Sequence, residues 1–174
     1  KRTQITFDDA RHYVAKTREK FDVITSDPIH PFVKGSAALY SKEYFEMLRD
    51  HLNPGGVVTQ WIPLYESDDR TVKSEIATFM EAFPYASIYA NLLDGNGYDL
   101  VLVGQNEAPK VDIDAIQARL ASAGYARVRA SLAEVSINSA ADLFATYSGD
   151  KAGLQPWLRD AEINHDNDMR LQYL

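Results

Sequence analysis

The chain has 174 residues, of which 45% are hydrophobic and 25% charged, and its formal net charge is −7 at pH 7. This length and composition suit one globular domain or a large part of one, and the acidic balance argues against nucleic acid as a partner, because phosphate binding depends on clustered Lys and Arg. The chain contains no Cys, which excludes disulfides and Cys-based zinc sites, and no apolar run approaches the ~20 residues of a membrane span.

Strand and helix patterns alternate in the first half of the chain. We expect a short strand at 4–7, a helix at 10–18, a buried strand at 21–26, a helix at 41–52 capped by Ser41, and a strand at 57–62 after the turn 53–56. A periodic apolar helix follows and ends at Pro84. Residues 86–93 and 98–104 read as two strands joined by Asp-Gly-Asn-Gly, a strong hairpin signal.

The pattern changes after Pro109, where helical pieces are expected at 112–123, 132–135, 140–147 and 152–160. The predicted fold is α/β: the C-terminal part of a Rossmann-like, methyltransferase-type sheet, mostly parallel, with a closing antiparallel hairpin and a helical C-terminal extension. We divide the chain into a partial Rossmann-like domain at 1–108 and a helical extension at 109–174.

Asp27 is the first candidate for chemistry, because it follows the buried strand 21–26 at its C-terminal end. In open α/β sheets, ligands bind at that edge. Asp before Pro is also common in turns, so capping of the loop is the other interpretation. His30 is either a site residue or a solvent-facing loop residue. Asp8 and Asp9 precede a helix, and we expect one to cap it and the other to face a ligand.

Several motifs together resemble the spermidine synthase (polyamine aminopropyltransferase) family, in particular a bacterial branch often fused to membrane-spanning segments. They are Asp-Asp-Ala-Arg at 8–11, Phe-Asp-Val-Ile-Thr-Ser-Asp-Pro at 21–28, the segment 36–45, Asn-Pro-Gly-Gly at 53–56 with the strand after it, and Ile-Asn-His-Asp-Asn-Asp at 163–168. Each motif is weak singly, but their order and spacing are fairly specific.

The resemblance implies a role for each matching residue. Asp27 stands at the catalytic aspartate, which takes a proton from the attacking amine. Asp9, with Asp8 beside it, stands at the acidic residue that binds adenine. Tyr40 lies in the loop over the site, and Gln60, or Trp61 one position further, stands where a polar residue faces the amine. The implied co-substrate is decarboxylated S-adenosylmethionine, or S-adenosylmethionine itself, with a small-molecule amine as the acceptor and no permanently bound cofactor.

The sequence departs from the family pattern at two places. His30 replaces a second acidic residue that helps to hold a cationic polyamine, which puts putrescine in doubt as the substrate. No GxGxxG turn for a nucleotide is present. We therefore expect part of a longer, cytoplasmic protein, with membrane segments, if any, outside this chain. We also expect this part alone to be inactive and its exposed sheet edge to favour homo-oligomers.

Two alternatives to aminopropyl transfer stay open. The same fold serves S-adenosylmethionine-dependent methyltransferases, and a non-catalytic nucleoside-binding or regulatory module would also keep it. His165, with Asp166 and Asp168, offers ligand types for a metal. A solvated turn explains that group better, and we predict no metal site.

Overall fold

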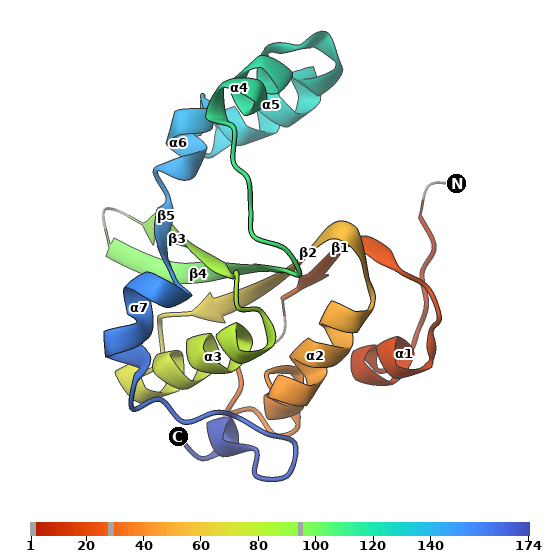
Figure 1. The fold of residues 1–174 in the computed structure, drawn as a ribbon, viewed down its shortest axis with the longest axis vertical. Helices are drawn as coiled ribbons and strands as arrows, with labels where there is room; N and C mark the ends of the chain where they lie inside the picture. The colour runs from red at the N-terminus through yellow and green to blue at the C-terminus, as the bar shows by residue number, and fades with distance from the viewer. Residues whose placement is uncertain (1–2, 28–29, 94–95) are drawn as a thin grey trace.

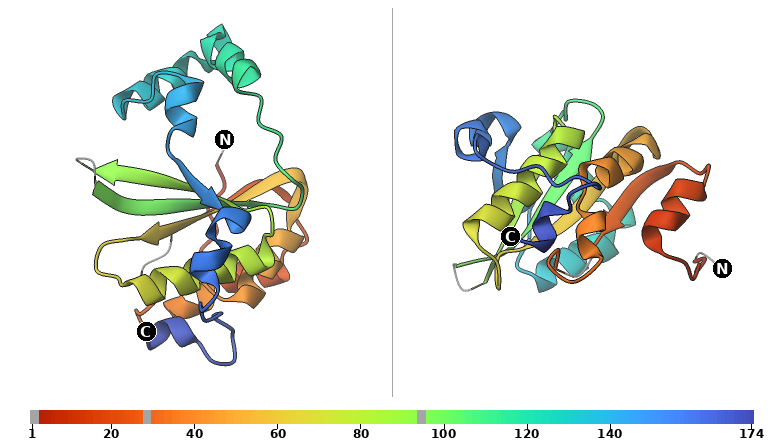
Figure 2. Two further views of the ribbon diagram at one scale, coloured as in Figure 1. Left: turned by 60° about the vertical axis from the view of Figure 1, so that its left-hand side comes forward. Right: turned by 90° about the horizontal axis from the view of Figure 1, so that it is seen from below.

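The computed structural model describes residues 3–27, 30–93 and 96–174, which form one five-stranded sheet with helices packed below it and a helical group above it (Figure 1). The helices α1 (Ala10–Lys16), α2 (Lys42–Asp50) and α3 (Asp69–Ala82) lie together on one side. A second group stands above the sheet in Figure 1 and in the left view of Figure 2, and it consists of α4 (Ile113–Ala121), α5 (Ala126–Glu134) and α6 (Ala140–Phe144). The last helix, α7 (Lys151–Leu158), returns to pack beside α3.

The strand order in the sheet is β1-β2-β4-β3-β5. The strands are β1 (Phe21–Ser26), β2 (Leu52–Pro63), β3 (Ser87–Leu93), β4 (Asn96–Gln105) and β5 (Tyr147–Asp150). Only β1 and β2 run parallel; the other three pairings are antiparallel. The α/β fold and the closing hairpin are confirmed, whereas the expectation of a mostly parallel sheet is wrong, because β4 returns beside β2 and β5 extends the far edge.

The Asn-Pro-Gly-Gly motif forms a wide bulge at the start of β2 rather than a turn before it. Phe21 pairs with Leu52 and Val23 with Val57, so three extra residues of β2 are accommodated between these pairs. Gly55 has a φ of +73°, which few side chains tolerate. A Cβ on Gly56 would lie 2.9 Å from the carbonyl oxygens of Asn53 and Phe21. Two glycines are therefore required where the chain enters the sheet.

Helix ends follow the capping residues in the sequence. The Ser41 hydroxyl accepts a hydrogen bond from the backbone N–H of Tyr44 (3.2 Å), as predicted, and Asp68 accepts one from Thr71 at the start of α3 (2.8 Å). The apolar faces of α2 and α3 meet the sheet in one core, whose largest fully buried members are Tyr40, Phe45, Leu48, Ile62, Phe79, Met80, Phe83, Leu102 and Leu171. No helix in the described ranges is both long and apolar enough to cross a bilayer.

Two sequence expectations about individual elements are wrong. Residues 4–7 form no strand, and Phe7 is 97% exposed. These residues have a high β propensity, but no strand lies beside them in the described part of the chain with which they could pair. The helix expected at 140–147 ends at Phe144, and Tyr147 begins β5, where it pairs with Tyr89. The expected hairpin turn includes Asp94 and Gly95, which lie outside the described residues.

Candidate functional site

Asp27 lies one residue beyond β1, at the edge where both parallel strands end. Ser26 pairs with Gln60 across the sheet, so Asp27 and the Gln60–Trp61 segment share that edge. The Asp27 side chain is exposed. Its position at the strand end is confirmed, while its catalytic role stays a prediction. Pro28, the next residue of the motif, lies outside the described residues.

Gln60 and Tyr40 lie fully buried between the sheet and the helices, just inside that edge. The Gln60 amide nitrogen donates to the carbonyl of Trp61 (3.1 Å), and its oxygen has no hydrogen-bond partner among the described residues. Burial raises the pKa of the Tyr40 hydroxyl, and the charges of Glu75 and Asp27 raise it further. Interaction with Gln60 lowers it. The Tyr40 hydroxyl therefore lies within electrostatic reach of all three groups.

Glu75 is a buried acid that the sequence analysis did not identify. It lies on α3 with 1% of its surface exposed, and burial raises its pKa to about 8. Neither carboxyl oxygen has a hydrogen-bond partner in the described ranges. Its spacing from Val72 and Phe79, at i−3 and i+4, puts an acid on the apolar face of the helix, which was the available sequence signal.

His30 lies in an aromatic cluster above the same edge. Its ring centroid is 5.0 Å from that of Phe32, 5.9 Å from Trp61 and 5.4 Å from Tyr65. Tyr65 in turn stacks on Tyr98 at 4.8 Å. The buried His30 Nε2 has no hydrogen-bond partner among the described residues. The imidazole is therefore only partly exposed and packs against aromatic rings, and its role as a site residue stays a prediction.

Asp8 and Asp9 are both engaged at the start of α1. Asp9 caps the helix, accepting from the backbone N–H of His12 (2.9 Å). Asp8 accepts from the backbone N–H of Asp9 (2.9 Å) and lies 3.0 Å from His12 Nδ1. The prediction that one of the two caps the helix is confirmed. The capping residue is Asp9, the one that the resemblance assigns to adenine.

Arg11 joins α1 to the loop that carries Tyr40. Its guanidinium donates to the carbonyl of Ala38 (2.6 Å) and the hydroxyl of Ser41 (3.1 Å), and it forms an ion pair with Asp166 in the tail. Residues 8–11, the loop 36–41 and the tail 163–168, each a motif in the sequence, therefore meet in space. Sequence reasoning identified the motifs but not this contact.

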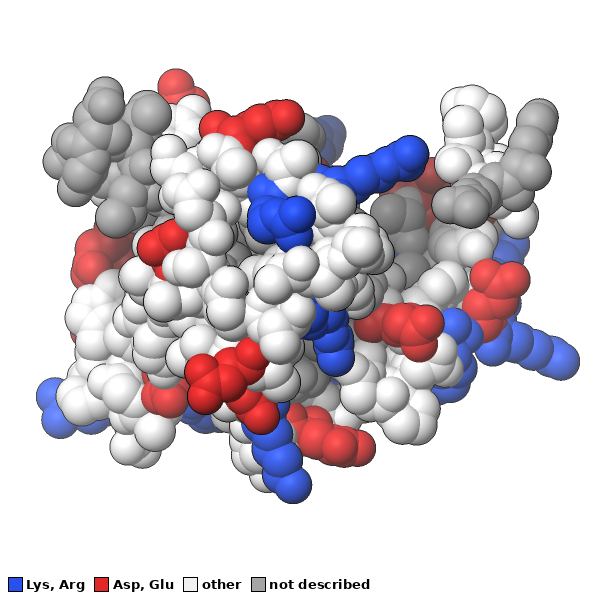
Figure 3. Space-filling view, turned by 90° about the horizontal axis from the view of Figure 1, so that it is seen from above, with Lys and Arg blue, Asp and Glu red and all other residues white. Residues whose placement is uncertain are grey.

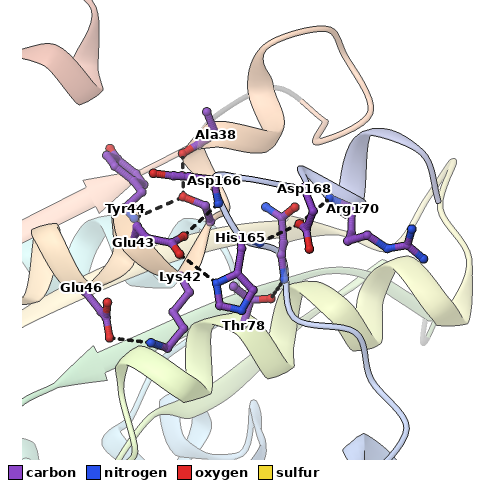
Figure 4. Close-up of polar contacts among 12 residues, drawn as sticks. Ala38, Lys42, Glu43, Tyr44, Glu46, Thr78, His165, Asp166, Asp168 and Arg170 are labelled. Atoms are coloured by element: carbon purple, nitrogen blue, oxygen red, sulfur yellow. Dashed lines mark hydrogen bonds and ion pairs between the residues drawn. The ribbon is translucent and has the colours of Figure 1, made fainter.

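Segment 162–171, which we call the tail strap, holds this region together (Figure 4). Asn164 is fully buried: its side-chain nitrogen donates to the carbonyl of Ala37 (2.8 Å), and its side-chain oxygen accepts from the N–H of Leu171 (3.2 Å). His165 Nδ1 lies 2.8 Å from Glu43 of α2, and the same carboxylate accepts from the N–H of Asp166 (3.0 Å). These bonds fix the loop before Tyr40 against α2 and α3.

Two further features, possible metal ligands and an apolar cavity, do not contribute to this site. No group of three or more His, Asp or Glu side chains in the described part of the chain is arranged to hold a metal. An apolar cavity of about 440 Å³ lies between α3, the sheet and α7, and Val72, Ile76 and Trp157 are among its lining residues. It includes none of the candidate site residues. The face of the molecule in Figure 3 carries acidic and basic side chains interspersed.

Comparisons with known proteins bear on this arrangement. The family model described as the spermine/spermidine synthase domain matches residues 1–115. A polyamine aminopropyltransferase of Aeropyrum pernix is 31% identical over 118 residues, which are 63% of this chain and 36% of that protein. The chain thus spans little more than a third of the length of this relative.

Solved structures agree on the fold. A probable spermidine synthase from Corynebacterium glutamicum matches with a TM-score of 0.57 at 22% identity, over 91% of this chain and 52% of its own. Spermidine synthase from Thermotoga maritima matches with a TM-score of 0.59 at 16% identity, over 87% of this chain and 48% of its own. The sheet and its closing hairpin therefore have the methyltransferase-like architecture of these enzymes.

Proposed function

We propose, from the premise that this chain belongs to the spermine/spermidine synthase domain family, that it provides the amine-binding and base-bearing part of an aminopropyltransferase. The reaction would transfer the aminopropyl group of decarboxylated S-adenosylmethionine to an amine. The observation that carries the proposal is the position of Asp27, exposed at the strand edge beside Gln60 and within electrostatic reach of Tyr40.

In the proposed reaction, Asp27 acts as the general base. The amine nitrogen forms a bond to the aminopropyl carbon next to the sulfonium, and the carbon–sulfur bond breaks. The electron pair of that bond stays on sulfur, so that methylthioadenosine leaves as a neutral thioether. The proton lost by the attacking nitrogen goes to the Asp27 carboxylate. Such a base contributes through its position first and its pKa second.

We assign the binding of the two substrates to the two sides of this edge. Tyr40 and Gln60 offer polar groups to the amine, and His30 with Trp61 lines its path. Asp9, with Asp8 beside it, serves the nucleoside. The capping bond of Asp9 is compatible with this role, since a carboxylate can accept several hydrogen bonds. Residues 1–108 would form this partial domain and 109–174 an extension packed on it.

The test is product release by the natural protein, with whatever segments flank this chain. Given decarboxylated S-adenosylmethionine and an amine, it should release methylthioadenosine, and Asp27→Asn should lower turnover by about 10²–10⁴-fold, as expected for a general base. Because Asp27 is exposed, thermal stability should not change. The control is Asp22→Asn at the other end of the same strand, where the side chain meets Asn53 (2.9 Å).

One observation favours a different outcome. His30 packs in an aromatic cluster where it presents no negative charge to a polyamine. If no amine supports methylthioadenosine release while the nucleoside still binds, the chain belongs to a non-catalytic nucleoside-binding protein. Formation of S-adenosylhomocysteine from S-adenosylmethionine would instead indicate methyl transfer and overturn the proposal.

A further inference from the structure

Glu75 occupies an unusual place for an ionisable side chain. It lies on α3 among residues that pack against the sheet, and 1% of its surface is exposed. A buried carboxyl group normally has a hydrogen-bond partner, because leaving it unpaired costs the full desolvation penalty of the group. Neither oxygen of Glu75 has one in the part of the chain that the structure describes. The fold thus keeps a buried acceptor that no described residue satisfies.

A second buried acceptor in the same state lies on β2. The side-chain oxygen of Gln60 is also buried and has no partner within the described ranges. The Tyr40 hydroxyl lies within electrostatic reach of both side chains and of Asp27 outside them. The unpaired acceptors are therefore close to the proposed base, on the inner side of the strand edge.

The chemistry of these groups selects a ligand class. A protonated primary amine has three N–H donors and no acceptor, so it can satisfy carboxylate and amide oxygens together. A carboxylate or phosphate would add further acceptors and negative charge. A neutral alcohol could satisfy an oxygen but would not compensate an ionised Glu75. The unpaired oxygens therefore match a small cationic amine.

We propose that Glu75, together with Gln60 Oε1, binds a protonated amino group of the amine substrate. This inference rests on the proposed function, in that the site must take an amine. Glu75 would then be a specificity-determining residue: it distinguishes amines that carry a second ammonium group from monoamines and from neutral analogues. Asp27 keeps the separate task of accepting the proton of the attacking nitrogen.

Binding through Glu75 has a measurable proton balance. With a pKa of about 8, Glu75 holds its proton at pH 7 in the free protein. An adjacent ammonium favours the ionised carboxyl group, so the proton leaves to solvent when the amine binds. The titratable groups near this position are Tyr40, Asp27 and Tyr65, from the loop before α2, the end of β1 and the loop before α3. His30, a further ionisable group, lies against Tyr65.

Calorimetric titration of the natural protein with putrescine tests the inference. In buffers of different ionisation enthalpy at pH 7, we expect close to one proton released per amine bound. Glu75→Gln should abolish this release and weaken binding by about tenfold or more. Glu107→Gln, an exposed control, should behave as the wild type. 1,4-Butanediol, which has no ammonium group, should bind weakly to the wild type and show no effect of Glu75→Gln.

Two results would overturn the inference: no proton release by the wild type, or the same release by Glu75→Gln. If Glu75→Gln does not fold, His30→Asn decides the question. Proton release should persist in His30→Asn, because Glu75 is still present. Loss of proton release in this variant would show that the proton comes from His30. The methylthioadenosine assay separates the two proposals. Proton release without transfer supports the role of Glu75 and rejects the proposed function. Transfer without proton release supports the proposed function and rejects the role of Glu75.

Discussion

Replacing Glu75 by Gln should change how the stability of the protein depends on pH. In the unfolded chain this carboxyl group titrates near its ordinary pKa of 4.5, and in the folded protein burial raises the pKa to about 8. Between these values the unfolded state has lost a proton that the folded state still holds. The free energy of unfolding therefore falls as pH rises through this window.

The magnitude follows from the size of the shift. Each pKa unit corresponds to about 1.4 kcal/mol, and the pKa of Glu75 shifts by about 3.5 units, from 4.5 to about 8. Ionisation of Glu75 therefore makes the protein less stable at pH 9 than at pH 4 by at most about 5 kcal/mol. Gln has nearly the same shape and does not ionise. Glu75→Gln should thus remove this contribution and stabilise the protein relative to the wild type increasingly above pH 5.

Urea denaturation of both proteins from pH 5 to pH 9 measures the effect. The expected result is a difference in unfolding free energy that grows by several kcal/mol towards high pH and levels off above pH 8. Comparison with Glu107→Gln, an exposed glutamate, subtracts the general effect of removing one charge. A constant difference across this range would show that Glu75 ionises normally in the folded protein, and the reasoning from burial would then be refuted.

Three further substitutions test the packing and the site. Gly104→Ala should cost about 1–3 kcal/mol in chemical denaturation, because the added Cβ would lie 2.5 Å from the buried ring of Phe83, whereas Gly124→Ala, with open space around it, should cost nothing. Asn164→Ala should cost about 1–3 kcal/mol, since it leaves the buried amide of Leu171 unpaired and removes one of the two hydrogen bonds to the Ala37 carbonyl; a loss below 1 kcal/mol would contradict this account of the tail strap. His30→Asp should lower the KM for putrescine by about tenfold with little change in kcat, and an unchanged KM would show that this position does not contact the amine.

The sequence predicted those parts of the fold that depend on neighbouring residues. The cap at Ser41, the cap at one of Asp8 and Asp9, and the apolar period of α3 are local signals, and they located the helix starts and the helix facing the sheet. The hairpin signal likewise predicted two adjacent antiparallel strands. The failures were strands whose existence depends on a distant partner. Residues 4–7 have the composition of a strand but no described neighbour, while Tyr147 belongs to a strand because β3 offers it an edge.

The residues of the candidate site also divide into those that the sequence could locate and those whose position depends on tertiary packing. Asp27 and Gln60 could be placed at one edge from the sequence, because parallel strands end on the same side of a sheet. Glu75 could not be assigned to that edge, since its position relative to the site depends on how α3 packs against the sheet. The meeting of Arg11 and Asp166 spans 155 positions of the chain. Such a pairing is decided by the tertiary fold.

The tail strap also has a consequence for the order of events during synthesis. Its residues leave the ribosome after every element that they contact, and Asn164 bonds to Ala37 across 127 positions. Contacts of such long separation form late, because the loop that they close costs entropy before they add stability. During translation, the loop that carries Tyr40 therefore lacks the hydrogen bond from Asn164 to the Ala37 carbonyl until the strap has been made. We expect the nascent chain to hold a preformed sheet but an unassembled site, and chaperones or proteases would meet it in that state.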